Sequence, residues 1–103
     1  MVVRQVFNAQ TQLGGQAPVL FSILRTKFLV GLNVDLVNGI TNYLIEFTTD
    51  DVGTNNSPRW LTYGGPNNGS MLVAIVIPIL AARINIQQVT GELRATWIQG
   101  VTA

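Results

Sequence analysis

The sequence contains no cysteine and no histidine. Without cysteine, disulfide bonds and thiolate metal sites are excluded, and cysteine usage gives no indication of the redox compartment. Without histidine, the chain lacks the commonest general base and the commonest protein ligand for metal ions. Residues 1–4 show no basic segment leading into an apolar run, so we expect no signal peptide.

Charge is also scarce. Charged residues make up 11% of the chain, against about 25% in ordinary soluble domains, and the formal net charge is only +1. The longest apolar run, residues 71–82, includes Pro78 and is shorter than the roughly 20 residues that a membrane-spanning helix needs. A surface with so little charge indicates a subunit that packs against other proteins, and a merely uncharged monomer is the alternative.

The remaining nucleophiles have no catalytic context. Ser22, Ser57, Ser70 and Lys27 lie in no nucleophile-elbow or Ser-x-x-Lys pattern, and no histidine is present to activate them. Residues 64–69 are glycine-rich, but they lack the Lys-Ser/Thr of a phosphate-binding loop, so we interpret them as a flexible connection. The sequence therefore predicts no catalytic residue and no cofactor site, and a protein that is not an enzyme.

Glu46, Asp50 and Asp51 form the one acidic cluster. Asp50 and Asp51 precede a turn-rich stretch, and aspartate is a common turn residue, so we predict a turn role for them. Two alternatives remain open. With Asn55 these oxygens could hold a calcium ion, although the spacing matches no EF-hand, and paired carboxylates could act in acid–base chemistry. We assign no metal site.

The basic residues are scattered along the chain, at Arg4, Arg25, Lys27, Arg59, Arg83 and Arg94. A nucleic-acid-binding protein normally concentrates its positive charge, so we predict no nucleic-acid partner. Trp60 and Tyr63 beside Arg59 could form a stacking platform, but Trp60 is better explained as an anchor for its loop. Arg83 and Arg94 are expected to lie on polar strand faces, where Glu46 or Glu92 could pair with them.

The residue usage favours β-structure, because valine, isoleucine and threonine are frequent whereas lysine and glutamate together occur three times. Alternating patterns predict strands in residues 82–86 and 93–97, and a hairpin over 28–48 that turns at Asn38-Gly39. Further strands are expected at 2–7, at 19–24, where a short helix is the alternative, and at 71–77, which is uniformly apolar and indicates a central strand. Residues 8–16 have no apolar period and are interpreted as a flexible arm or a surface loop.

Together these patterns predict one all-β domain over residues 1–103. Turn residues recur at short intervals between the candidate strands. Seven to eight short strands with such spacing are typical of an antiparallel β-sandwich of jelly-roll or Greek-key type.

The C-terminal part of the chain resembles a known group of proteins. Residues 43–51 (YLIEFTTDD), the Arg59-Trp60-Leu61 loop, residues 78–84 (PILAARI) and the terminal residues 96–100 (TWIQG) occur in an order that is similar to that of small β-rich virion proteins of tailed bacteriophages. This group includes capsid cement, or decoration, proteins. The resemblance covers roughly the C-terminal 60 residues, and its motifs are short. The Ala-Ala-Arg spacing in residues 81–83 departs slightly from the pattern of that group.

The resemblance implies a structural role in the phage head. Such a subunit is made in the host cytoplasm, binds the major capsid protein across its seams, and often forms a homotrimer. We take Arg59, Trp60, Tyr63 and Arg83 as the candidate interface residues. The alternative function is a tail or fibre component, in which Trp60, Tyr63 and residues 64–69 recognise a host receptor.

Overall fold

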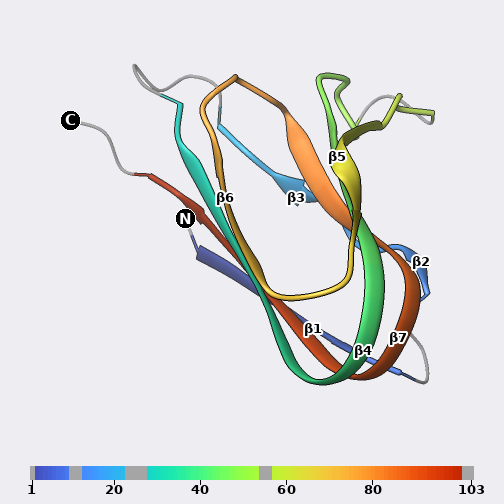
Figure 1. The fold of residues 1–103 in the computed structure, drawn as a ribbon. Coiled ribbons are helices and arrows are strands. Elements are labelled where there is room, and N and C mark those ends of the chain that lie inside the picture. Colours follow the sequence, from blue (N-terminus) through green and yellow to red (C-terminus); the bar gives the residue numbers. More distant parts are fainter. Residues whose placement is uncertain (1, 10–12, 23–27, 54–56, 101–103) are drawn as a thin grey trace.

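A computed structural model describes residues 2–9, 13–22, 28–53 and 57–100 (Figure 1). The described residues form seven strands, which are β1 (Val2–Asn8), β2 (Gly14–Gly15), β3 (Val19–Leu20), β4 (Val30–Thr48), β5 (Leu61–Asn67), β6 (Met71–Ile75) and β7 (Ala81–Gln99). All of them belong to one antiparallel sheet.

Two long strands, β4 and β7, form the frame of the sheet. Each is 19 residues long, and they pair along their whole length, from Val30 opposite Gln99 to Thr48 opposite Ala81. The shorter strands border one end or the other of this pair. We call the part of the sheet with residues 30–38 of β4 and 92–99 of β7 the first half; there β1 lies beside β7 and β6 lies beside β4. The second half has residues 40–48 of β4 and 81–90 of β7; there β2 and β3 lie beside β7 and β5 lies beside β4.

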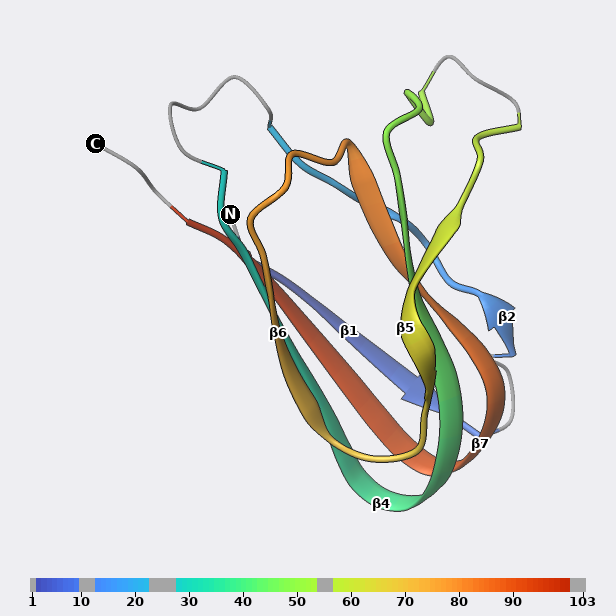
Figure 2. The same cartoon turned by 45° about the horizontal axis from the view of Figure 1, so that its top comes forward.

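Both long strands turn back on themselves at the same point (Figures 1 and 2). Gly39 of β4 is paired there with Gly91 of β7, and their φ angles are 85° and 94°, a region that glycine adopts without strain. The register of the β4–β7 pair shifts on both sides of this point, between Leu36 and Asn38 and between Asn42 and Tyr43. Such irregularities bend a strand, so we refer to the Gly39–Gly91 pair as the corner.

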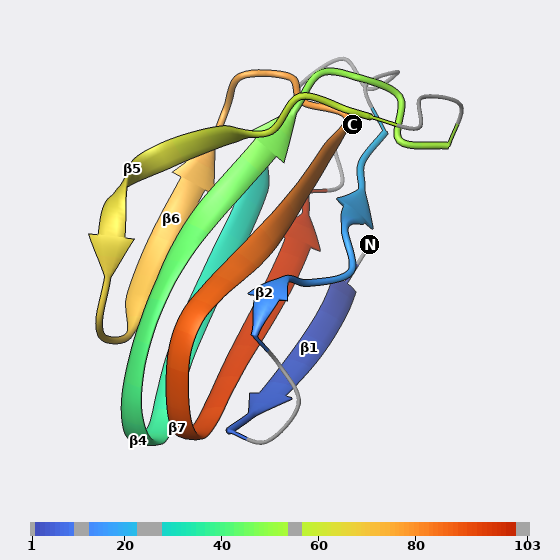
Figure 3. The same ribbon diagram turned by 90° about the vertical axis from the view of Figure 1, so that its right-hand side faces the viewer.

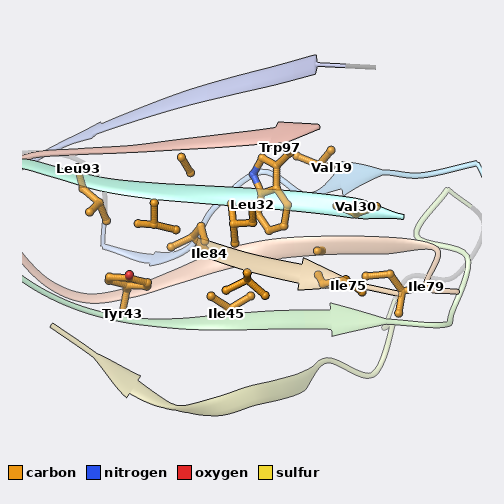
Figure 4. Packing of buried hydrophobic residues seen from close by; sticks show 14 of the residues in the cluster. Val19, Val30, Leu32, Tyr43, Ile45, Ile75, Ile79, Ile84, Leu93 and Trp97 are labelled. Carbon is orange, nitrogen blue, oxygen red and sulfur yellow. The ribbon is translucent and has the colours of Figure 1, made fainter. Parts of the chain in front are cut away.

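The corner lets the two halves of the sheet face each other across the hydrophobic core. Buried side chains of β4 stand at even positions before the corner, as at Leu32, and at odd positions after it, as at Tyr43. Figure 4 shows Leu32 and Trp97 from the first half pointing toward Ile45 and Ile84 from the second. Because the period of a strand is two, the shift in register is what keeps both apolar sets on the inner side.

The predicted hairpin over residues 28–48 is wrong. Residues Asn38 and Gly39 lie inside the continuous strand β4, opposite Glu92 and Gly91. The two expected late strands, residues 82–86 and 93–97, are likewise parts of the single strand β7. The alternation of apolar residues changes phase near Gly39 in β4 and near Gly91 in β7. In the sequence, such a change of phase looks the same as a turn between two strands. In the structure each half of β4 pairs with β7 instead of with the other half, because the corner carries both chains around together.

The all-β class is confirmed, with seven antiparallel strands in a single open sheet; a jelly-roll or Greek-key sandwich is not shown. The strand expected over residues 71–77 is found at 71–75 as β6, but its predicted central position is wrong, because β6 pairs with β4 alone within the described residues. The expected strand over residues 19–24 is found in part, as β3, and its last two residues lie outside the described ones. In the predicted arm or loop, Gly14 and Gly15 pair with β7.

Candidate functional site: an apolar outer face

The outward side of the first half carries a row of apolar residues that crosses four strands. The register places Val2 of β1 beside Ile98 of β7, Ile98 beside Gly31 of β4, and Gly31 beside Ala74 of β6. Directly paired residues point to the same side of a sheet, so this row forms one strip of surface. Val2 is 65% exposed and Ile98 is 49% exposed, which confirms that the strip faces outward.

Polarity increases from this strip toward the corner. The next row contains Arg4, Thr96, Asn33 and Leu72, and the row after that contains Val6, Arg94 and Asp35. Glu92 accepts a hydrogen bond from Arg94 close to the corner. Arg94, Asp35 and Glu92 therefore lie toward the corner, Arg4 lies one row from the far end, and the outermost row at that end has no charge.

Glycine makes the apolar strip uneven. Leu29, Gly31, Ile98 and Gly100 line an open hollow of about 280 Å³. Gly31 and Gly100 contribute no side chain there, so Ile98 and Leu29 stand above their surroundings, and Leu29 is 42% exposed. We call the set Val2, Leu29, Leu72, Ala74 and Ile98 the apolar face. A ridged, uncharged surface of this kind is suited to close contact with another protein.

The β6 strand and the two residues after it form the most exposed apolar part of the described chain. Leu72 is 81% exposed, Ile77 is 71% exposed and Val76 is 66% exposed, the three highest values among the large hydrophobic side chains described. Beside them, a hollow of about 190 Å³ opens between β5 and β6, lined by Phe47, Tyr63, Ala74, Ile75, Val76, Ile77 and Ile79. All of its lining residues are apolar or aromatic.

Two of the four candidate interface residues meet on the outward side of the second half. The guanidinium of Arg83 lies 4.3 Å from the ring centre of Trp60, and its Nε donates to Glu46 Oε1 at 2.8 Å. Asn85 Nδ2 donates to the other oxygen of Glu46 at 3.3 Å. Arg83 thus pairs with Glu46, as expected, and Trp60 covers the pair. The contacts of this cluster lie within the chain, which favours a role in packing.

The other two candidates lie elsewhere. Tyr63 is paired with the buried Ile45, and the centres of the Tyr63 and Phe47 rings are 6.4 Å apart. Tyr63 therefore lies on the inner side of the sheet, opposite to Trp60. Arg59 is exposed, and its backbone N–H donates to Asp50 Oδ2 at 2.7 Å. The structure therefore does not bring Trp60 and Tyr63 into one surface, as the receptor-binding alternative requires.

The acidic residues bind backbone groups. Besides its contact with Arg59, Asp50 donates its N–H to Thr48 Oγ1, and Asp51 Oδ1 accepts the N–H of Gly53 at 2.9 Å. These are the contacts of turn residues. Asn55, the third oxygen donor considered for calcium, lies outside the described residues. Among the described residues, no group of three or more acidic side chains is placed to hold a metal ion.

Among the described titratable groups, Tyr43 is one whose pKa the fold changes. Its side chain is fully buried at the centre of the core, where its hydroxyl donates to the carbonyl of Gly69 at 2.7 Å. Burial raises the pKa of the Tyr43 phenol from 10.0 to about 12. The hydroxyl therefore stays neutral and serves to tie the β5–β6 connection to β4.

The apolar face is a candidate site that sequence reasoning missed. An apolar residue at an outward position looks like a core residue until the register is known. Two signals were nevertheless present: residues 71–77 are apolar without alternation, and Ile98 directly follows the core residue Trp97. Both indicate strands with an apolar side chain on each face.

Comparison of the chain with protein-family models, with curated proteins and with solved structures finds no match. In the part of the chain that the structure describes, no helix is long and apolar enough to cross a membrane.

Proposed function

We propose that the chain is a non-enzymatic structural subunit of a tailed-phage virion, bound to the head as a capsid cement or decoration protein. Its partners in this proposal are the major capsid protein and further copies of itself. The two facing halves of the bent sheet serve as the sandwich-like body expected for this class. The observation that carries the proposal is the apolar face, an outward surface whose outermost row has no charged residue across four strands.

An uncharged face supports attachment to a protein surface rather than to nucleic acid. Phosphate groups are bound mainly by lysine and arginine, and the outermost row contains neither. Apolar area removed from water stabilises a complex by roughly 25 cal/mol per Å², so a partner that covers Ile98, Val2 and Leu29 binds more tightly. Many copies on one capsid lattice would add the effect of multivalent attachment.

The resemblance of residues 43–100 to tailed-phage virion proteins supports the head as the location. The resemblance and the apolar face share Ile98, whereas Val2, Leu29, Leu72 and Ala74 lie outside the quoted motifs. A protein that bridges capsomers needs shape and apolar contact and no catalytic group, and the sequence offers no nucleophile–base pair.

The test is binding to phage heads that lack this protein. Purified wild-type chain should co-sediment with the heads, and imaging should place its density over the shell. Ile98→Lys puts a charge at the centre of the apolar face and should reduce binding at least tenfold. Val37→Lys is the matched control, because Val37 is 43% exposed and lies beside the corner, away from the apolar face.

Two results would contradict the proposal. Density in the tail instead of over the shell would remove the head location, and equal binding of the Ile98→Lys and Val37→Lys variants would remove the apolar face as the contact. Circular dichroism of both variants shows whether the fold is kept, which we expect because both side chains face solvent.

A further inference from the structure

The β6 strand has a sequence that does not fit its position. A strand that is apolar at every position normally lies inside a sheet, with both faces and both edges covered. Residues 71–77 have this character, and no charged residue occurs from 71 to 82. In the chain by itself, however, β6 is an edge strand within the described sheet, and Leu72 is 81% exposed.

The free edge of β6 also lacks the usual protection against pairing. Edge strands in soluble proteins are commonly blunted by lysine, by proline or by a bulge. Residues 71–77 contain no lysine and no proline, and Pro78 comes only after them. The β4–β6 pairing is regular over five successive pairs, from Val30 opposite Ile75 to Val34 opposite Met71. The free edge therefore has no bulge and no charge, and it is able to pair with another strand.

We propose that β6 pairs with β6 of a second copy of this chain, antiparallel and around a two-fold axis. Two identical edge strands in this arrangement are complementary by symmetry, and neither brings a charge to the contact. The proposal deepens the proposed function, since it rests on a structural subunit whose copies associate. It gives β6 the central position that its sequence indicates, in a sheet that continues from β4 of one copy to β4 of the other.

The register follows from the length of the strand. Pairing centred on Val73 lets all five residues of both strands take part, and it places Leu72 of each copy beside Ala74 of the other. A large side chain then meets a small one on the outward side, which joins the two apolar faces into one surface. Val73 and Ile75 keep their places in the core, where they are 8% and 6% exposed.

The size of the contact sets its strength. A five-residue edge with Val76 and Ile77 beside it belongs to the small class of interfaces, below about 1,200 Å² in total. Contacts of this class are transient, so we expect the dimer to dissociate at low micromolar concentration. A two-fold pair also replaces the homotrimer that the family resemblance implies.

The first measurement is the molar mass of the purified chain by light scattering or sedimentation, over about 1 to 200 µM. We expect a shift from one copy to two across this range. Hydrogen exchange should slow with concentration in the β6 peptide and stay constant in β1, another edge of the same half-sheet. A monomer at all concentrations, a trimer, or protection of β1 in place of β6 would overturn the proposal.

Leu72→Lys is the variant that tests the edge directly. Leu72 faces solvent in the single chain, so lysine should leave the fold intact and raise the dissociation constant of the dimer at least tenfold. Leu13→Lys is the matched control, because Leu13 is 64% exposed and precedes β2, which borders β7 on the side away from β6 (Figure 3). An unchanged dimer in Leu72→Lys, or equal weakening in both variants, would refute the β6 contact.

The outcome is separable from that of the proposed function. The mass and exchange measurements use the purified chain alone, whereas the function is tested on phage heads with Ile98→Lys. A chain that dimerises through β6 and does not bind heads would keep the inference and lose the function. A monomer that binds heads would do the reverse.

Discussion

The corner offers the sharpest test of the fold, because two glycines there meet the opposite strand at very short range. A Cβ atom built on Gly39 would lie 1.6 Å from the carbonyl oxygen of Thr90. On Gly91 it would lie 2.3 Å from the carbonyl oxygen of Asn38. Real Cβ contacts are longer than 3.0 Å, so Gly39→Ala cannot be accommodated unless the backbones of β4 and β7 separate at the corner.

The expected cost of Gly39→Ala has two parts. A positive φ costs an alanine about 1–2 kcal/mol, and forcing a methyl group into a closed space costs about 1–3 kcal/mol more. Gly64→Ala is the matched control: the φ of Gly64 is 72°, and a Cβ atom at this position would have nothing within 4 Å. It should incur the first part only. We therefore expect Gly39→Ala to be less stable than Gly64→Ala by about 2 kcal/mol.

Urea unfolding of both variants and the wild type measures the difference as a shift of the midpoint at constant slope. In a domain of this size about 2 kcal/mol corresponds to roughly 10 °C in Tm. Gly91→Ala is a second probe of the same contact and should resemble Gly39→Ala. If Gly39→Ala and Gly64→Ala are equally stable, β4 and β7 do not meet at the corner and the bent-sheet description is refuted.

Three further predictions concern interactions inside the chain. Arg83→Ala leaves the carboxylate of Glu46, whose side chain is 11% exposed, without its charged partner, and should lower the free energy of unfolding by about 3 kcal/mol. A double-mutant cycle with Glu46→Gln should show coupling between the two residues, and additive effects would contradict the ion pair. Because the pKa of Tyr43 is raised in the folded state, its contribution to the free energy of unfolding is complete below pH 10 and is lost as the pH rises toward about 12. The loss is at most about 3 kcal/mol. The free energy of unfolding of Tyr43→Phe should not show this loss between pH 10 and 12. Gln99 binds the backbone of Ser22 through both amide atoms, at 3.0 and 2.6 Å, so Gln99→Ala should cost about 2 kcal/mol and speed amide exchange at Ser22; unchanged exchange would argue against this link.

The sequence predicted which residues form the core better than how the strands are connected. Val30, Leu32, Tyr43, Ile84 and Trp97 stand at the apolar positions of the alternating patterns in residues 28–48, 82–86 and 93–97, and all five are buried. The connection at residues 38–39 was not predictable from the same pattern. A hairpin turn and a bend shared by two strands both need glycine at positive φ and both change the phase of alternation. Only the presence of a second, equally long strand with its own glycine separates the two.

The candidate site was less predictable than the core. Aromatic and charged residues are few in this sequence and are common in binding sites, which favours Arg59, Trp60, Tyr63 and Arg83 as candidates. The apolar face consists of residues that are indistinguishable from core residues until the register assigns them a side. The uniformly apolar residues 71–77 predict a central strand, yet among the described strands β6 pairs with β4 alone, because residue type does not reveal which edge of a strand has a neighbour.

The small charge content acquires a physical explanation once the charged residues are located. Glu46 and Arg83 pair with each other, Arg94 binds Glu92, and Asp50 and Asp51 accept backbone N–H groups in their turn. Most described carboxylates are thus engaged inside the chain, in the second half or near the corner. Among the described residues, the outermost row of the first half has no charged side chain, and the nearest charge on that side is Arg4 in the next row. A subunit that remained alone in water would need charged side chains there to stay soluble, whereas an assembled subunit would lose binding energy by having them. The proposed function explains the scarcity of charge and the position of the apolar face by one cause, a surface that other protein covers.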